Sequence, residues 1–306
     1  MERMKILIDT DPGVDDALAI LMAHRHADVV GLTIAAGNVG LGHTVANALK
    51  LTDVIGADTP VFAGCQMPLV RAAEDAAFVH GQDGFGDAGL APGKRAVESE
   101  HAVQAILRLS HQHAGSLVVV ALAPLTNLAL ALRLDPSLPQ RIPRLVVMGG
   151  AVTGQGNTSA VAEFNFGFDP EAAHIVLSSW PMLELVDWEL CTRHAFEFDT
   201  MDRWVAAGTE SARFYDAISR KTRAWSRERG RPRLAVADSV AMAVALRPDL
   251  ATRMAERHVG IELDGTHTRG MSVVDWDGRL GGVPNARIVS ELDQARFEAL
   301  AATAFE

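Results

Sequence analysis

The sequence predicts an α/β protein with an open, mostly parallel β-sheet that carries helices on both faces, a Rossmann-like arrangement. Short and almost wholly apolar runs recur along the 306 residues, and helical patterns separate many of them. Strands of this composition are typical of parallel sheets that helices cover on both faces. The hydrophobic content of 48% is sufficient for one large core. We therefore expect a single domain, residues 1–306, with right-handed crossovers.

Each element follows from a local pattern. Strand-like runs occur at residues 6–8, 29–36, 60–64, 116–122, 144–148 and 182–186. Helical patterns follow at residues 44–55 and from the segment 123–127 to residue 134. Residues 200–229 also have a helical pattern, and the strongly charged end of this region favours a solvated face. Residues 257–264, 270–276 and 286–289 predict a small antiparallel addition near the C-terminus, and residues 295–305 predict a closing helix.

Composition narrows the class of ligand. The net charge of −10 argues against nucleic-acid polymers and anionic membranes, which recruit basic patches. Cys65 and Cys191 lie far apart and predict neither a disulfide framework nor a zinc site. No apolar run reaches the roughly 18 residues of a membrane span, and residues 1–8 do not resemble a signal peptide. We expect a cytoplasmic protein with free thiols and a small neutral substrate.

Four aspartates fall within eight residues near the N-terminus: Asp9, Asp11, Asp15 and Asp16. They follow the apolar run at residues 6–8, and an amphipathic helix follows them. Asp11 is placed to cap that helix, and Pro12 suits its first position. The carboxylates therefore gather where a strand ends and a helix begins, which is the edge at which open parallel sheets bind ligands.

A helix cap and a favourable helix dipole explain one or two of these aspartates. Four adjacent carboxylates repel each other, so a bound cation is the better explanation, and hard carboxylate oxygens suit calcium or magnesium. Asp9 and Asp11 also fit the D-x-D spacing of a haloacid-dehalogenase phosphatase. The sequence pattern of that family, however, does not include Pro-Gly followed by Asp-Asp after the second aspartate.

The sequence D-T-D-P-G-V-D-D-A at residues 9–17 resembles the N-terminal signature of the nucleoside hydrolases, the inosine-uridine preferring family. The resemblance extends from about residue 5 to about residue 289. It implies a calcium ion held by Asp11, Asp16, Asp238 and the backbone carbonyl of Thr126. Two substrate hydroxyls and a water would complete a coordination number of about 8. Without the resemblance, Thr126 and Asp238 can also be explained as helix caps.

The same resemblance implies a ribose site. Asp15 matches the residue that holds the 2′-hydroxyl, and Asn38 lies in A-G-N, beside the metal and the attacking water. The block G-N-T-S-A-V-A-E-F-N-F supplies the sugar-binding residues Asn157, Glu163 and Asn165. Amide and carboxylate groups are suited to hydroxyl partners. On its own, Asn157 is a turn residue and Glu163 a solvated one.

The leaving-group side matches the family less completely. The loop F-V-H-G-Q-D-G resembles the one that carries a histidine, here His80, over the base. Ala237 stands where family members carry His or Trp, and a methyl group can neither donate a proton nor stack. Base preference and the leaving-group acid therefore stay open. Trp225 is either a wall of the pocket or an amphipathic packing residue.

The resemblance implies an N-ribosyl hydrolase that uses Ca²⁺ to convert purine or pyrimidine ribonucleosides into ribose and free base, with Asp11 as general base for the attacking water. No G-x-x-x-x-G-K loop is present, which favours a nucleoside over a nucleotide. Family members also suggest a homodimer or homotetramer. Two alternatives remain: a phosphatase built on Asp9 and Asp11, and a nucleoside-binding protein without catalysis, suggested by Ala237.

Overall fold

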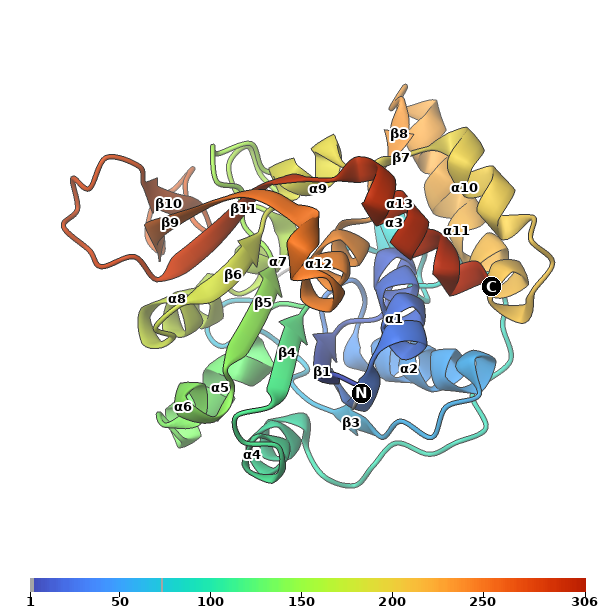
Figure 1. Cartoon of the computed structure of the whole chain (residues 1–306), viewed down its shortest axis with the longest axis horizontal. Helices are drawn as coiled ribbons and strands as arrows, with labels where there is room; N and C mark the ends of the chain where they lie inside the picture. Colours follow the sequence, from blue (N-terminus) through green and yellow to red (C-terminus); the bar gives the residue numbers. More distant parts are fainter. Residues whose placement is uncertain (1–2, 73) are drawn as a thin grey trace.

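A nine-stranded sheet runs through the molecule (Figure 1). The structure is a computed structural model and describes residues 3–72 and 74–306. In spatial order the strands are β10 (Ser272–Asp275), β9 (Ala251–Ile261), β11 (Ala286–Leu292), β6 (Leu183–Val186), β5 (Arg144–Met148), β4 (Leu117–Ala121), β1 (Lys5–Thr10), β2 (Asp28–Ile34) and β3 (Val61–Ala63). From β3 to β11 every neighbouring pair is parallel. The predicted fold class is confirmed.

Helices cover both faces of the sheet. One face carries α1 (Val14–His26), α2 (Leu41–Ile55), α9 (Trp188–Arg193), α10 (Phe198–Val205), α11 (Glu210–Glu228), α12 (Ala237–Leu246) and α13 (Gln294–Ala302). The other carries α4 (Ala102–Gln112), α5 (Thr126–Leu134), α6 (Leu138–Arg141), α7 (Phe164–Phe168) and α8 (Pro170–Ser179). In β1, Ile6 and Ile8 pack into the first core and Leu7 into the second, because side chains alternate along a strand.

The short elements complete the chain. They are α3 (Ala77–His80), the two-stranded antiparallel ribbon β7 (Phe196–Glu197) and β8 (Arg233–Leu234), and the 3₁₀ turns Pro248–Leu250 and Thr303–Phe305. None of the helices in the described part of the chain combines the length and the apolar character that crossing a bilayer requires.

Three local expectations differ from the structure. The helix after the aspartates begins at Val14, so Asp11 does not cap it; Gly13 precedes the helix, and its N–H donates to Asp16 Oδ2 at 2.9 Å. The helical region at 200–229 is two helices, because Gly208 adopts a φ of +77° between α10 and α11. The antiparallel addition is continuous with the main sheet, since β11 pairs in parallel with β6 and antiparallel with β9.

The order of the strands places the ligand-binding edge. The chain runs outward from β1 to β2 and β3, and then returns to the other side of β1 to form β4, β5 and β6. The strand order therefore reverses between β1 and β4. A crevice opens at such a switch point, outside the carboxyl ends of the strands. The aspartates that follow β1 and the residues that follow β4 both lie at this edge.

Candidate active site

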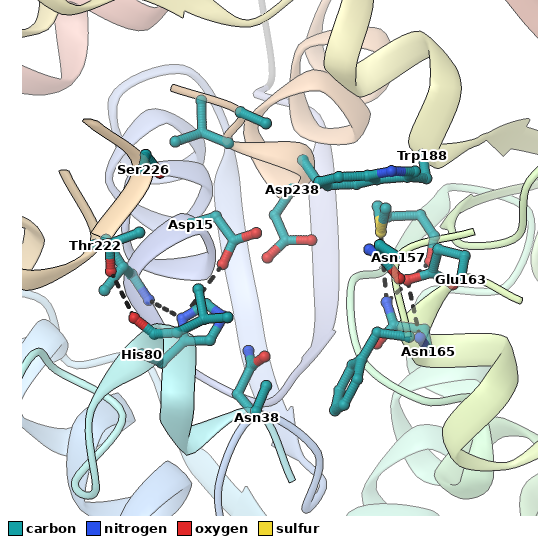
Figure 2. Close-up of a pocket in the computed structure, with 18 of the residues that line it drawn as sticks. Asp15, Asn38, His80, Asn157, Glu163, Asn165, Trp188, Thr222, Ser226 and Asp238 are labelled. Atoms are coloured by element: carbon teal, nitrogen blue, oxygen red, sulfur yellow. Dashed lines mark hydrogen bonds and ion pairs between the residues drawn. The ribbon is translucent and has the colours of Figure 1, made fainter. Parts of the chain in front are cut away.

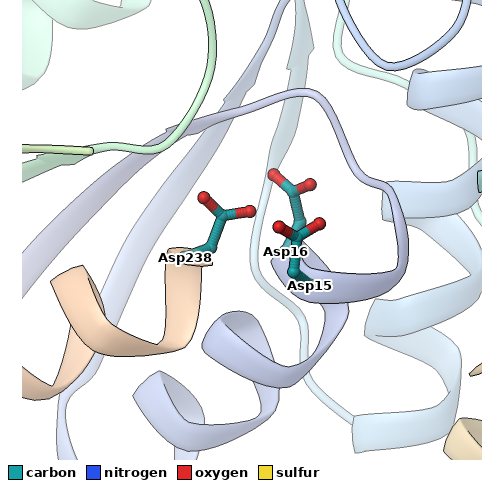
Figure 3. A group of neighbouring side chains, drawn as sticks. All are labelled: Asp15, Asp16 and Asp238. Atoms are coloured by element: carbon teal, nitrogen blue, oxygen red, sulfur yellow. The ribbon is translucent and has the colours of Figure 1, made fainter. Parts of the chain in front are cut away.

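Two neighbouring helices bring three carboxylates together at this edge. Asp15 and Asp16 lie in the first turn of α1, and Asp238 lies in the first turn of α12, which packs against α1 (Figure 3). One oxygen from each of the three side chains lies within 4.8 Å of the other two. The positive ends of both helix dipoles face this cluster and partly stabilise the negative charges.

The cluster is short of positive charge. Burial raises the pKa of Asp15 to about 6, and burial with the nearby charge of Asp15 raises the pKa values of Asp16 and Asp238. No Lys or Arg among the described residues forms an ion pair with these three groups, and Asp15 Oδ1 is buried without a hydrogen bond. Asp16 and Asp238 are buried and Asp15 is partly buried with one oxygen that lacks a hydrogen bond. Such a group fits a hard divalent cation, which removes the repulsion and gives that oxygen a partner.

Asp11 lies beside the cluster and is fixed by the loop after β2. The N–H of Asn38 donates to Asp11 Oδ2 at 2.6 Å, and Asn38 Nδ2 donates to the Asp11 carbonyl at 3.1 Å and to Asp16 Oδ2 at 3.0 Å. A Cβ at Gly37 would lie 2.1 Å from Asp11 Oδ2, so only glycine leaves room for this carboxylate. Burial and the charge of Asp16 hold the pKa of Asp11 well above its usual range.

Asp9 and Thr126 belong to the structural network under the site and do not line the pocket. Asp9 Oδ1 accepts hydrogen bonds from Thr33 Oγ1 at 2.7 Å and from Asn127 Nδ2 at 2.9 Å. Asp9 is fully buried, which removes it from the nucleophile position that the phosphatase alternative requires. Thr126 is the first residue of α5 and not its cap, and its Oγ1 donates to Asp169 Oδ2 at 2.7 Å.

A polar wall faces the carboxylates across the pocket (Figure 2). Glu163 is 2% exposed and caps α7, so it is not the solvated residue that its pattern alone allows. Its carboxylate accepts from the N–H groups of Gly150 and Asn165 at 2.9 and 2.8 Å, and burial nevertheless raises its pKa to about 7. Asn165 Nδ2 donates to the carbonyl of Leu122 at 2.7 Å. Asn157 lies at the mouth of the same wall and is exposed.

His80, Trp225 and Ala237 also line the pocket. His80 Nδ1 accepts the N–H of Val14 at 3.2 Å and lies 3.9 Å from Asp15 Oδ1. Burial lowers the pKa of His80 to about 4, so the imidazole is neutral at pH 7 with its proton on Nε2. Trp225 does line the pocket, and its ring packs against Phe78 with 6.2 Å between centroids.

The pocket also contains residues that the sequence interpretation missed. They are chiefly Trp188, Thr222, Ser226 and Arg231 (Figure 2 labels the first three). Trp188 follows β6 at the same sheet edge, so the rule that ligands gather after parallel strands could have found it. Trp225 and Ser226 follow Thr222 by three and four residues, which places both beside Thr222 on the surface of α11. The charged residues around them led to the interpretation of a solvated face.

Comparisons with known proteins agree with this geometry. Residues 6–299 match the family model described as inosine-uridine preferring nucleoside hydrolase. The non-specific ribonucleoside hydrolase RihC of Klebsiella pneumoniae is 36% identical over 302 residues, which cover 98% of this chain and 97% of the relative. The pyrimidine-specific ribonucleoside hydrolase RihB of Escherichia coli K12 is 33% identical, over 97% and 95% of the two chains. The solved structure of an inosine-guanosine nucleoside hydrolase superposes with a TM-score of 0.91 at 32% identity, covering 100% and 99%.

The fold and the site therefore define an enzyme that hydrolyses N-glycosidic bonds of nucleosides. The match covers nearly the whole chain. Of the carboxylate cluster, Asp15 and Asp238 line the pocket, and Asp16 lies directly behind them within the cluster. The chain belongs to the inosine-uridine preferring nucleoside hydrolase family and is an N-ribosyl hydrolase.

Proposed function

We propose that the chain hydrolyses purine or pyrimidine ribonucleosides to ribose and free base in a reaction that requires Ca²⁺. The observation that carries this proposal is the carboxylate cluster, which has no Lys or Arg partner among the described residues and of which Asp15 and Asp238 face an amide and carboxylate wall across one pocket (Figure 2). Asp11, Asp16, Asp238 and the Thr126 carbonyl would hold the ion. When bound, Ca²⁺ supplies the charge that offsets these carboxylates and favours loss of a proton from nearby water.

The chain's own residues position the sugar. Asp15 keeps one oxygen free of any hydrogen bond and is the proposed partner of the 2′-hydroxyl. The amide N–H groups of Asn165 donate to main-chain carbonyls at the ends of β4 and β5. Its side-chain oxygen is therefore available to accept a hydrogen bond from a hydroxyl. Glu163 and Asn157 extend the same wall. Several fixed partners convert binding energy into orientation of the reacting carbon.

The reaction needs a base beside the sugar. Asp11 would take a proton from the attacking water while the bond between C1′ and the base nitrogen breaks, and the bond's electron pair leaves with the base. Asn38 donates to Asp11 and Asp16 together, which makes it a positioning residue for both carboxylates. The neutral His80 can offer an Nε2–H hydrogen bond to the departing base.

The nucleobase is less narrowly defined than the sugar. The relatives' names range from non-specific to pyrimidine-specific and inosine-guanosine enzymes. Because Ala237 contributes only a methyl group to the pocket, we propose that both purine and pyrimidine ribonucleosides enter. The family resemblance further supports a homodimer or homotetramer and a cytoplasmic location.

A reducing-sugar assay on inosine, adenosine, guanosine, uridine and cytidine tests the proposal. Ribose should form from at least one nucleoside, EDTA should abolish its formation, and Ca²⁺ should restore it. Full activity of a verified metal-free sample would refute the metal requirement. Calorimetric binding of a nucleoside without turnover would instead favour the non-catalytic binding protein.

A further inference from the structure

Arg231 is fixed over the last turn of α11 by the way that helix ends. Gly230 adopts a φ of +63°, and its N–H donates to the carbonyl of Arg227 at 2.9 Å. The N–H of Arg231 donates to the carbonyl of Ser226 at 3.1 Å. This pair of hydrogen bonds is a Schellman motif, which folds the residue after the glycine back along the helix. Arg231 is thereby directed toward the pocket wall that Trp225 and Ser226 form.

The guanidinium of Arg231 is held by an aromatic ring and has no carboxylate partner. Its central carbon lies 4.6 Å from the centroid of Trp225, a cation–π distance. Arg229 contacts the same ring at 4.1 Å. Arg231 lines the active-site pocket, and Arg229 does not. No described residue accepts a hydrogen bond from the Arg231 side chain, although acidic groups pair most neighbouring arginines of α11.

The reaction creates a need for positive charge beside the departing nucleobase. When the glycosidic bond breaks, negative charge develops on the base. Ala237 offers no donor there, and His80 has one ring nitrogen committed to the N–H of Val14. Among the described residues that line the pocket, Arg231 is the one with a cationic side chain. All of its side-chain N–H donors are free to bind a ligand. Planar guanidinium donors match the adjacent acceptor atoms on the edge of a base.

Building on the proposed function, we propose that Arg231 is a catalytic residue that stabilises the departing nucleobase by hydrogen bonding to its acceptor atoms. The bond from C1′ to the base nitrogen breaks, and its electron pair stays on the base. Burial and the charge of Arg229 lower the pKa of Arg231, but an arginine side chain keeps its proton at neutral pH, so the guanidinium remains protonated throughout. The base takes its proton from solvent water, while the attacking water gives its hydroxyl to C1′ and its proton to Asp11. Arg231 thus acts by charge stabilisation and not as a general acid.

The test compares Arg231→Gln with the matched control Arg229→Gln, which removes the other guanidinium from the same ring. Each variant is assayed as Ca²⁺-loaded enzyme with inosine and with p-nitrophenyl β-D-ribofuranoside, whose phenolate needs little stabilisation. Arg231→Gln should lower kcat for inosine by about 100-fold, the low end for loss of one such donor. It should change the nitrophenyl reaction by less than about 3-fold, and Arg229→Gln should leave both reactions near the unmodified rates.

A rescue experiment distinguishes a chemical from a structural role. Free guanidinium ion should restore part of the inosine turnover of Arg231→Ala, and it should not accelerate the unmodified enzyme. Equal losses on both substrates, or equal behaviour of the Arg231 and Arg229 variants, would overturn the proposal and leave Arg231 as a cover for Trp225. If the unmodified enzyme releases ribose from no nucleoside yet cleaves the nitrophenyl riboside, the proposed function fails independently of Arg231.

Discussion

Replacing Asp238 with asparagine should have opposite effects on stability with and without Ca²⁺. The side chain keeps its size, but the cluster with Asp15 and Asp16 loses one of its three charges. In the metal-free protein this removes repulsion, so the melting temperature should rise. In the presence of Ca²⁺ it removes one of the proposed ligands, so the melting temperature should fall.

The size of both effects follows from the geometry. Two unit charges 4.8 Å apart interact by about 3.5 kcal/mol at an effective dielectric constant of about 20, and Asp238 has two such neighbours. Proton uptake by the cluster relieves most of this repulsion, so we expect metal-free Asp238→Asn to be about 1 kcal/mol more stable. Ca²⁺ at 100 times its Kd should stabilise the unmodified protein by about 2.7 kcal/mol, or roughly 5 °C.

Differential scanning fluorimetry of both proteins, with EDTA and with Ca²⁺, measures the two opposite changes in melting temperature directly. Asp53→Asn is a matched control, since Asp53 lies far along α2 and bonds the N–H of Lys94. If Ca²⁺ raises the melting temperature of Asp238→Asn as much as that of the unmodified protein, the assignment of Asp238 as a ligand is refuted. A metal-free variant less stable than the unmodified protein would refute the claim that the cluster is repulsive.

The pH dependence should have a defined sign. The pKa values of Asp15, Asp16 and Asp238 are raised in the folded protein, that of Asp15 to about 6. A carboxyl group with a raised pKa stabilises the fold fully below its unfolded value of about 4 and loses that contribution as pH rises through the folded value. Without metal, the protein should therefore be less stable at pH 7.5 than at pH 5. The calcium increment should be larger at pH 7.5, and a pH-independent increment would contradict this.

Three further outcomes test the site. A 2′-deoxynucleoside leaves Asp15 without its partner, so kcat/KM for 2′-deoxyinosine should fall by about 10⁴-fold relative to inosine, and equal values would exclude the assignment of Asp15. His80→Ala should slow hydrolysis of natural nucleosides far more than that of p-nitrophenyl β-D-ribofuranoside; an equal loss on both would mean that His80 is not a leaving-group donor. Asp9→Asn should retain nucleoside turnover within about 10-fold, since Asp9 lies outside the pocket, and release of phosphate from sugar phosphates that depends on Asp9 would revive the phosphatase alternative.

The main sheet was predictable because its strands carry a simple signal. Residues buried on both faces give continuous apolar runs, and the run at 144–148 coincides with β5. The expected antiparallel addition was harder to place. Strand β11 has one parallel and one antiparallel neighbour, and no local pattern distinguishes a strand that ends a parallel sheet from one that starts a separate sheet.

The candidate site was predictable where residues act in groups at strand ends. Asp238 lies far from Asp15 and Asp16 in the sequence, and the packing of α1 against α12 brings the three together. The position of Arg231 could not be read in the same way. It depends on a hydrogen-bonded turn at the end of α11, and in the sequence Arg231 is one of several similar arginines. In a stretch of many charged residues, the sequence alone does not distinguish the one arginine that lines the pocket from those that face solvent.

The two aspartates of the D-x-D sequence show how the surroundings assign different roles to identical side chains. Asp9 still lies within β1, where Thr33 and Asn127 donate to one of its oxygens and bury it between neighbouring elements. Asp11 lies beyond the strand end, where the N–H of Asn38 donates to one oxygen beside the carboxylate cluster. A nucleophile must reach substrate, whereas a general base needs only a fixed orientation next to water. The surroundings of Asp9 suit neither task, and those of Asp11 suit the second.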